Sequence, residues 1–63
     1  MYDSSFDMED FYGDVVTLNY CEAGGPATVT IWAETDYQNR PLVKRFNSED
    51  EAYNWAFRHG YRE

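Results

Sequence analysis

The residues best suited to chemistry or recognition are the carboxylates near the start of the chain. The stretch YDSSFDMEDFYGD, residues 2–14, contains five acids and no lysine or arginine. Four of these acids recur at intervals of four, three and four residues: Asp3, Asp7, Asp10 and Asp14. Helical residues three or four apart lie ~5–6 Å from each other, so a helical segment would carry one carboxylate stripe. That spacing is of the same order as the phosphate spacing of duplex DNA.

Other chemistry has weaker support in the sequence. Carboxylates are ligands for Ca²⁺ or Mg²⁺, but in DMEDFYGD the glycine and the closing glutamate of a calcium loop are misplaced. One cysteine and one histidine are too few for a zinc site. A catalytic pair of Cys21 and His59 would need a group that orients the base and a cleft for the substrate. We therefore expect no catalytic residue, metal or cofactor, and a small enzyme that uses this pair remains an alternative.

The charge is strongly acidic and unevenly placed. The formal net charge is −7 over 63 residues. Residues 1–39 contain eight acids and no lysine or arginine, whereas residues 40–63 contain all five bases and four acids. Such a chain is repelled by nucleic acid and by anionic membranes and is attracted to basic surfaces. A second interpretation is that the acidity only keeps a small protein in solution.

Length and composition indicate one small domain, residues 1–63. Two tryptophans, six tyrosines and four phenylalanines enrich a core that would otherwise be marginal at this size. The single cysteine, Cys21, cannot form an internal disulfide, which favours a reducing compartment. No apolar run is long enough to span a membrane, and the N-terminus does not resemble a signal peptide. We expect a cytoplasmic protein, in a bacterial host cell if a phage encodes it.

Three segments have the patterns of strands. Residues 13–22 and 28–34 alternate apolar and polar side chains. The turn AGGPA, residues 23–27, is short enough to connect them as an antiparallel hairpin. A polar loop, residues 35–41, precedes a third short strand, residues 42–47.

The last segment predicts a helix. Ser48 is a candidate N-cap, and Glu51 stands three residues later, which is the capping-box pattern. Ala52 and Ala56 fall on one face, and their small side chains would allow the helix to approach a sheet closely. Gly60 is suited to the position that follows the helix C-terminus.

These elements predict an α+β fold with a three-stranded antiparallel sheet and one C-terminal helix. Residues 14–63 would form this β-β-β-α core. Residues 1–13 would form an acidic aromatic arm or a short helix that ends at Gly13. In either form, this segment would close the sheet face that the C-terminal helix leaves uncovered, using Phe6, Met8, Phe11 and Tyr12.

In general character the chain resembles the small acidic inhibitors that phages and mobile elements make against host machinery. These include DNA-mimic anti-CRISPR proteins and inhibitors of host polymerase. The resemblance lies in the length, the acidic residues 1–39, the stretch DSSFDMEDFYGD, the many aromatics and the lack of catalytic groups. It implies a non-enzymatic protein that blocks the basic nucleic-acid site of a larger protein or nucleoprotein complex, without binding nucleic acid directly.

The residues expected to bind such a partner are eight acids and two aromatics. They are Asp3, Asp7, Glu9, Asp10, Asp14, Glu22, Glu34, Asp36, Trp32 and Tyr37. Exposed aromatic side chains often dominate protein interfaces, and this is why Trp32 and Tyr37 are included. The alternative is a β-sheet interaction module that acts as a homodimer or adaptor through an exposed strand edge.

Overall fold

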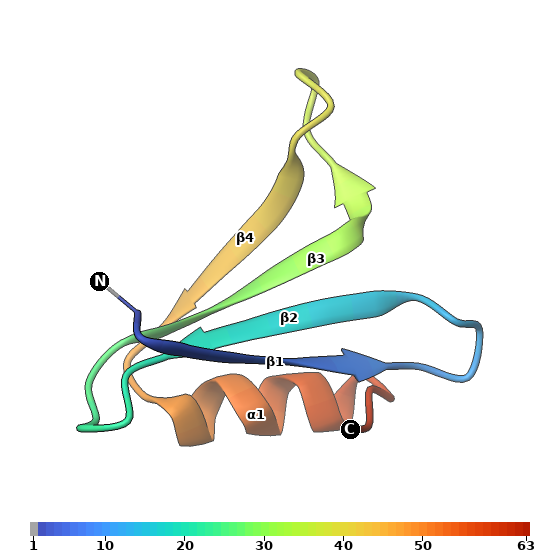
Figure 1. Ribbon diagram of the computed structural model, residues 1–63. Helices are drawn as coiled ribbons and strands as arrows, with labels where there is room; N and C mark the ends of the chain where they lie inside the picture. Colours follow the sequence, from blue (N-terminus) through green and yellow to red (C-terminus); the bar gives the residue numbers. More distant parts are fainter. Residues whose placement is uncertain (1) are drawn as a thin grey trace.

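The computed structural model describes residues 2–63, and this part of the chain folds into four strands followed by one helix. The strands are β1 (Ser4–Glu9), β2 (Val15–Tyr20), β3 (Ala27–Thr35) and β4 (Pro41–Phe46), and the helix is α1 (Glu49–Arg58). The sheet order is β1-β2-β3-β4, with every neighbouring pair antiparallel (Figure 1). The predicted α+β class, antiparallel sheet and C-terminal helix are confirmed.

The predicted number of strands was wrong, because the N-terminal segment forms β1 rather than a helix or an arm. Phe6 and Met8 explain this outcome. Two positions apart, they share one side of a strand, whereas on a helix they would be separated by about 200°. As a strand, the segment buries Met8 to 1% exposure and leaves Ser5, Asp7 and Glu9 exposed on the other side. Burial of these apolar side chains outweighs the helical spacing of the carboxylates.

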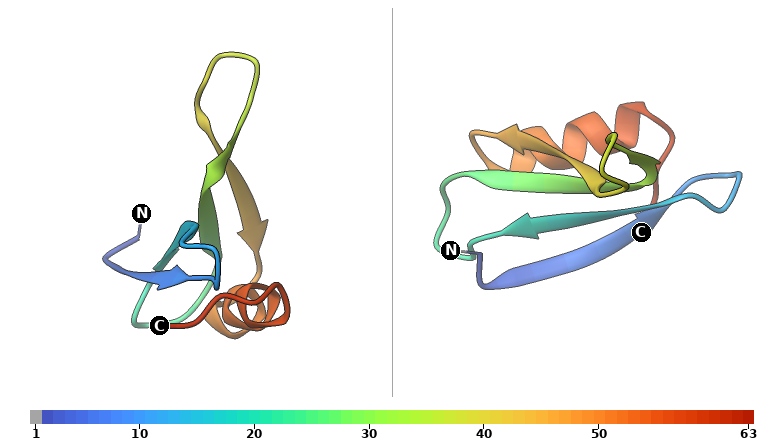
Figure 2. Two further views of the ribbon diagram at one scale, coloured as in Figure 1. Left: turned by 90° about the vertical axis from the view of Figure 1, so that its right-hand side faces the viewer. Right: turned by 90° about the horizontal axis from the view of Figure 1, so that it is seen from above.

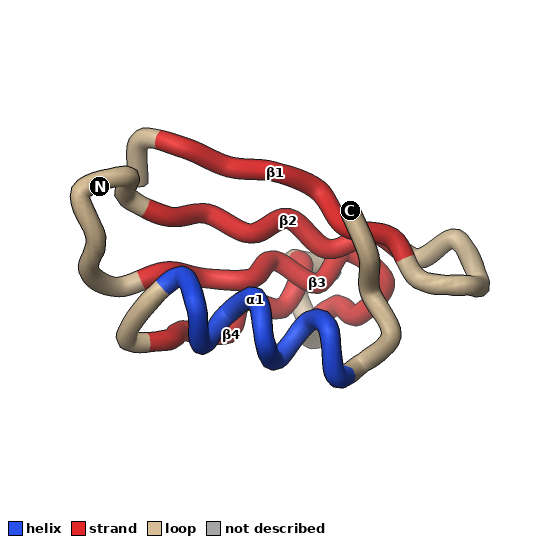
Figure 3. The backbone as a smooth tube through the Cα atoms, turned by 90° about the horizontal axis from the view of Figure 1, so that it is seen from below, coloured by secondary structure: helices blue, strands red, loops and turns tan. Residues whose placement is uncertain are grey.

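The core lies between the sheet and α1, which contacts β2, β3 and β4. Figure 2 shows α1 on one face of the sheet, and Figure 3 shows it running along the strands rather than across them. The buried side chains are Met8, Val16, Leu18, Ala27, Val29, Ile31, Ala52, Ala56 and Tyr61. The complete burial of Ala52 and Ala56 accounts for the close approach of helix and sheet.

Both ends of α1 are capped by the residues that the sequence indicates. The backbone amide of Glu51 donates to the Ser48 hydroxyl at 3.2 Å, as in an N-cap. At the other end Gly60 has φ 91°, and the amide of Tyr61 donates to the Ala56 carbonyl at 3.0 Å. This Schellman-type ending turns the chain back over the helix and inserts Tyr61 into the core.

The face of the sheet opposite α1 is here called the open face, because no helix or strand within residues 2–63 covers it. The prediction that the N-terminal segment closes this face was wrong. Met8 belongs to the core on the helix side of the sheet, and Phe6 packs against that core. Phe11 and Tyr12 lie in the β1–β2 turn, and Phe11 is 95% exposed. Residues 2–63 contain no helix of the length and apolarity that a membrane crossing requires.

Candidate functional site

Five carboxylates gather along β1 and the turn that follows it, and we call this surface the acidic edge. Its members are Asp3, Asp7, Glu9, Asp10 and Asp14. Asp7 and Glu9 lie on the open face, because they alternate with Phe6 and Met8. The predicted helical stripe of four aspartates is therefore wrong: in extended chain Asp3 and Asp7 are ~13 Å apart. The acids share an edge of the sheet rather than one face of a helix.

Two of these carboxylates also organise the local backbone. Asp10 Oδ1 accepts the amides of Tyr12 at 2.9 Å and Asp14 at 2.8 Å, which shapes the β1–β2 turn. Asp3 Oδ1 accepts the amide of Glu22 at 3.1 Å, which ties the start of the chain to the β2–β3 turn. Glu22 in turn accepts from the Ser4 hydroxyl at 3.2 Å. These aspartates have structural roles in addition to their charge.

Asp7 is the end of a hydrogen-bond chain that crosses three strands on the open face. The indole Nε1 of Trp32 donates to Thr17 Oγ1 at 2.8 Å, and Thr17 donates its proton to Asp7 Oδ1 at 2.7 Å. Trp32 therefore lies across the sheet with 53% of its surface exposed. Sequence reasoning selected Trp32 and Asp7 as separate contacts and missed Thr17, because only the strand register shows that these side chains are neighbours.

The bases lie away from the acidic edge. Arg62 is the nearest, because its backbone pairs with Glu9, but its guanidinium lies 3.9 Å from the centre of the Phe57 ring. The same guanidinium donates to the carbonyls of Phe57 at 3.0 Å and Tyr61 at 2.9 Å. Arg58 Nε donates to a carbonyl of its own helix.

The remaining bases lie on or next to β4, at the opposite edge of the sheet from β1. Arg40 forms an ion pair of 3.3 Å with Asp36, and Lys44 Nζ lies 5.8 Å from the centre of the Trp55 ring. Arg45 is on β4, the edge strand farthest from β1. Within residues 2–63 the pair of Arg40 and Asp36 is the one ion pair closer than 4 Å. No base among the described residues therefore forms an ion pair with the acidic edge.

The other predicted contact residues lie in the β3–β4 hairpin, whose tip projects beyond β1 and β2 (Figure 1). Asp36 folds the tip by accepting the amides of Arg40 at 3.0 Å and Gln38 at 2.8 Å. Hydrogen bonds hold the pKa of Asp36 below its ordinary value, although desolvation opposes them. The bond from the Arg40 amide has the largest effect, and the bonds from the Gln38 amide and the Arg40 side chain add to it. Tyr37 is 91% exposed beside it. This hairpin tip is separate from the acidic edge.

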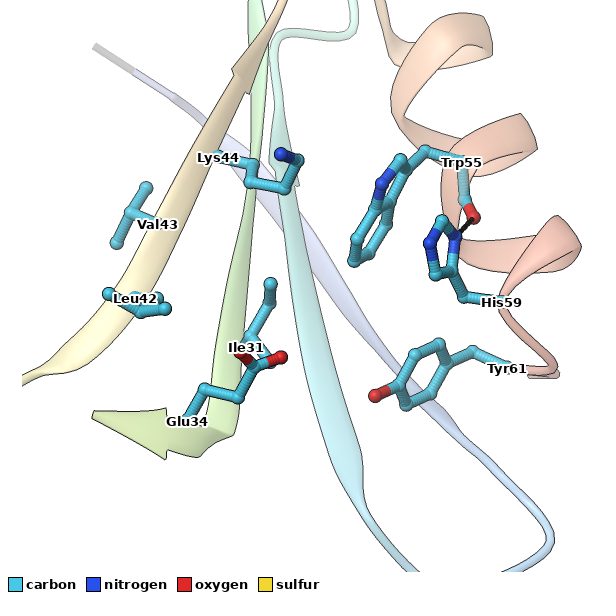
Figure 4. Close-up of a pocket in the computed structure, with 8 residues that line it drawn as sticks. All are labelled: Ile31, Glu34, Leu42, Val43, Lys44, Trp55, His59 and Tyr61. Atoms are coloured by element: carbon cyan, nitrogen blue, oxygen red, sulfur yellow. Dashed lines mark hydrogen bonds between the residues drawn. The ribbon is translucent and has the colours of Figure 1, made fainter. Parts of the chain in front are cut away.

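A groove of about 410 Å³ lies between the β3–β4 hairpin and the end of α1 (Figure 4). Trp55, His59 and Tyr61 form its aromatic wall, and Lys44 and Glu34 bring one charge of each sign. Burial, assisted by the nearby carboxylates of Asp10, Asp14 and Glu34, raises the pKa of the Tyr61 hydroxyl. The sequence did not indicate this groove, because its walls come from segments that meet only in the folded chain.

The candidate catalytic pair is placed at opposite ends of α1. Cys21 follows β2 at the end of the molecule where α1 begins, whereas His59 caps the other end (Figure 1). The His59 ring stacks on Trp55 at 4.2 Å between centroids, and Nδ1 lies 2.7 Å from the Trp55 carbonyl. Among residues 2–63, no three His, Cys, Asp or Glu side chains are close enough to hold a metal ion.

Comparison with known proteins adds no identification. The chain matches no family model, no curated protein and no solved structure. The fold places the chain in the class of α+β proteins with an antiparallel sheet and a C-terminal helix.

Proposed function

We propose that this chain is a non-enzymatic protein that binds and blocks a basic, nucleic-acid-binding surface of a larger protein. The supporting observation is the separation of charge: five carboxylates line the acidic edge, and the five bases are engaged or placed elsewhere. Unneutralised carboxylates attract the lysines and arginines that would otherwise contact phosphates. The protein would act as a DNA mimic in the broad sense, by steric and electrostatic competition, as an anti-CRISPR-like phage inhibitor does.

The strand arrangement gives this mimicry a different geometry from a helical stripe. Alternate residues of a strand are ~6.8 Å apart on one face, so Asp7 and Glu9 present two carboxylates at that interval. Asp10 and Asp14 continue the negative surface into the exposed turn, where Phe11 and Tyr12 offer apolar contacts. Aromatic side chains are enriched at interface centres and charged ones belong to the polar rim, so Phe11 and Tyr12 would be the anchors and the acids would surround them.

The test compares two triple variants of equal charge. D7N/E9Q/D14N removes three charges from the acidic edge, and E49Q/D50N/E51Q removes three from the first turn of α1. The wild-type chain would first be used to capture proteins from candidate host cells. The captured proteins would be identified and purified. Each would then be titrated with both variants over a range of salt concentrations. The acidic-edge variant should bind at least about tenfold more weakly, which corresponds to about 1.4 kcal/mol, and the helix variant should bind like the wild type.

Competition with duplex DNA tests whether the chain occupies the partner's nucleic-acid site. If the chain blocks the nucleic-acid site, added DNA should displace it from the captured protein, and the affinity should fall steeply as salt rises. If both triple variants lose binding equally, binding depends on the net charge of the protein and not on the position of the acidic edge. Undiminished binding of the acidic-edge variant would refute the proposed function.

A further inference from the structure

The outer side of β1 has backbone groups without a strand partner. Glu9 directs its amide and carbonyl away from β2, because both bond to Arg62, at 2.8 and 2.9 Å. Backbone groups alternate along an antiparallel strand, so the amides and carbonyls of Asp7 and Ser5 point to the same outer side. No backbone partner for them lies among residues 2–63. The unpaired edge ends at Asp3, whose amide turns inward to Tyr20.

Edge strands are usually protected from pairing by prolines, bulges and charged side chains, above all lysine. β1 has no proline, lysine or bulge and pairs with β2 in unbroken register from Ser4 to Glu9, and its charged side chains, Asp7 and Glu9, are both acidic. β4, the opposite edge, begins at Pro41, contains Lys44 and has a register shift against β3. The two edges therefore differ, and β1 is the one open to an added strand.

Arg62 shows that this edge accepts an extended segment through its backbone, while its own guanidinium is directed to Phe57. It is a basic residue in extended pairing with Glu9, and it is the only strand-like partner that residues 2–63 supply to the outer side of β1. A hollow of about 250 Å³ adjoins the same place, and it is lined by the acids Asp7, Glu9 and Glu63, by the base Arg62, and by Met8 and Val15. Three acids face one base whose guanidinium is directed to Phe57, so the lining is negative on balance and suits a cationic side chain.

A second copy of the chain is a poor occupant for this edge. Antiparallel pairing of two β1 strands would bring Asp7 and Glu9 close to the same acids of the other copy. Like charges opposite each other destabilise a strand pair, whereas opposite charges stabilise it. The edge therefore favours a strand rich in lysine or arginine.

We propose that Ser5 and Asp7 of β1 pair by strand addition with an extended basic segment of the partner, with lysine or arginine at alternate positions. This inference rests on the proposed function and specifies how the basic surface is held. Main-chain hydrogen bonds to Ser5 and Asp7 would supply affinity, and the open-face carboxylates would select the basic side chains. The added strand would stop where Arg62 already occupies the edge.

The probe is a blocked synthetic peptide of alternating lysine and valine, used with the full chain. Amide hydrogen exchange, followed by NMR, should slow at least about tenfold at Ser5 and Asp7 when the peptide is added, because their amides become bonded. The amide of Glu9, which is already bonded to Arg62, should change little. A peptide of equal charge whose lysine amides are N-methylated lacks the donors that would face β1, because backbone groups alternate along a strand, and it should not slow exchange.

Ser5→Pro removes one outward amide without changing the charge, and its control is Ser5→Thr. Proline is tolerated where a strand amide faces solvent, so S5P should fold and bind the lysine–valine peptide at least about tenfold more weakly than S5T. If S5P does not fold, the exchange rates of the wild type decide the question. Slowed exchange at Ser5 and Asp7 without peptide, in step with protein concentration, would show self-pairing and overturn the proposal.

The two proposals fail in different ways. Peptide binding that depends on Asp7 and Glu9, without slowed exchange at Ser5 and Asp7, would overturn strand addition and leave the proposed function intact. If the wild type does not bind the peptide but captured partners still require the acidic edge, strand addition would again be overturned and the proposed function would stand. Strand addition to the D7N/E9Q variant as strong as to the wild type would overturn the requirement for a basic segment.

Discussion

Glu9 and Arg62 exchange two backbone hydrogen bonds, yet the guanidinium of Arg62 lies over Phe57 and not against the Glu9 carboxylate. The contact thus joins β1 to the segment after α1 and leaves the acidic edge charged. A basic residue whose backbone pairs with that of an acidic residue would ordinarily be expected to neutralise it with its side chain. Here the aromatic ring and two carbonyl oxygens direct the cation toward the helix.

Arg62→Ala should destabilise the fold by about 1–2 kcal/mol, because it removes a cation–π contact and two hydrogen bonds. Urea denaturation followed by circular dichroism measures the change. Arg58→Ala removes the same charge with one long hydrogen bond of 3.4 Å and is the matched control. Equal effects of the two variants would mean that the Phe57 contact adds nothing.

Met8→Ala should cost about 2–5 kcal/mol, since Met8 is fully enclosed between the sheet and α1. The loss distinguishes a strand that belongs to the core from a removable arm. Ser5→Ala, on the open side of the same strand, should change the free energy of unfolding by less than about 0.5 kcal/mol. A small effect of M8A would contradict the position of β1 in the sheet.

Asp10→Ala should destabilise the β1–β2 turn by about 1–2 kcal/mol, because two backbone amides lose their acceptor. Asp10→Asn keeps an acceptor oxygen in the same place and should retain most of this stability. Thermal unfolding of both variants measures the difference. If D10N is as unstable as D10A, the charge of Asp10 rather than its hydrogen bonds supports the turn.

Tyr61 should make stability depend on pH on the alkaline side. Its raised pKa in the fold means that the neutral phenol is favoured. This contribution is complete below the unfolded-state value of about 10 and is lost as the pH rises through the folded-state value. Phenolate absorbance should show a late-titrating tyrosine that Tyr61→Phe removes. Retention of the late step in Y61F would assign it to another tyrosine.

The elements that were predicted correctly are those with local signals. Alternation identified the strands at residues 15–20 and 41–46 with small errors at the ends, and Ser48 with Glu51 identified the start of α1. β1 was missed because its acids have helical spacing and its strand signal consists mainly of Phe6 and Met8. Propensity and charge spacing could not show that these two side chains would complete the core.

The site depended on contacts that no local pattern contains. The chain from Trp32 through Thr17 to Asp7 requires the register of three strands. The position of the Arg62 guanidinium requires the turn at Gly60. Sequence reasoning could therefore name acids and aromatics as candidates, but it could not separate those at the acidic edge from those at the hairpin tip.

The bridge between Glu9 and Arg62 also has a kinetic consequence. Neighbours in the sheet are neighbours in the sequence, and α1 follows directly after β4, so most pairings close short loops and can form early. The bridge instead joins residues from the first strand and from beyond the helix, and its closure carries a larger entropic cost. We expect it to form last during folding and to open first, so that the edge of β1 is exposed before the hairpins separate.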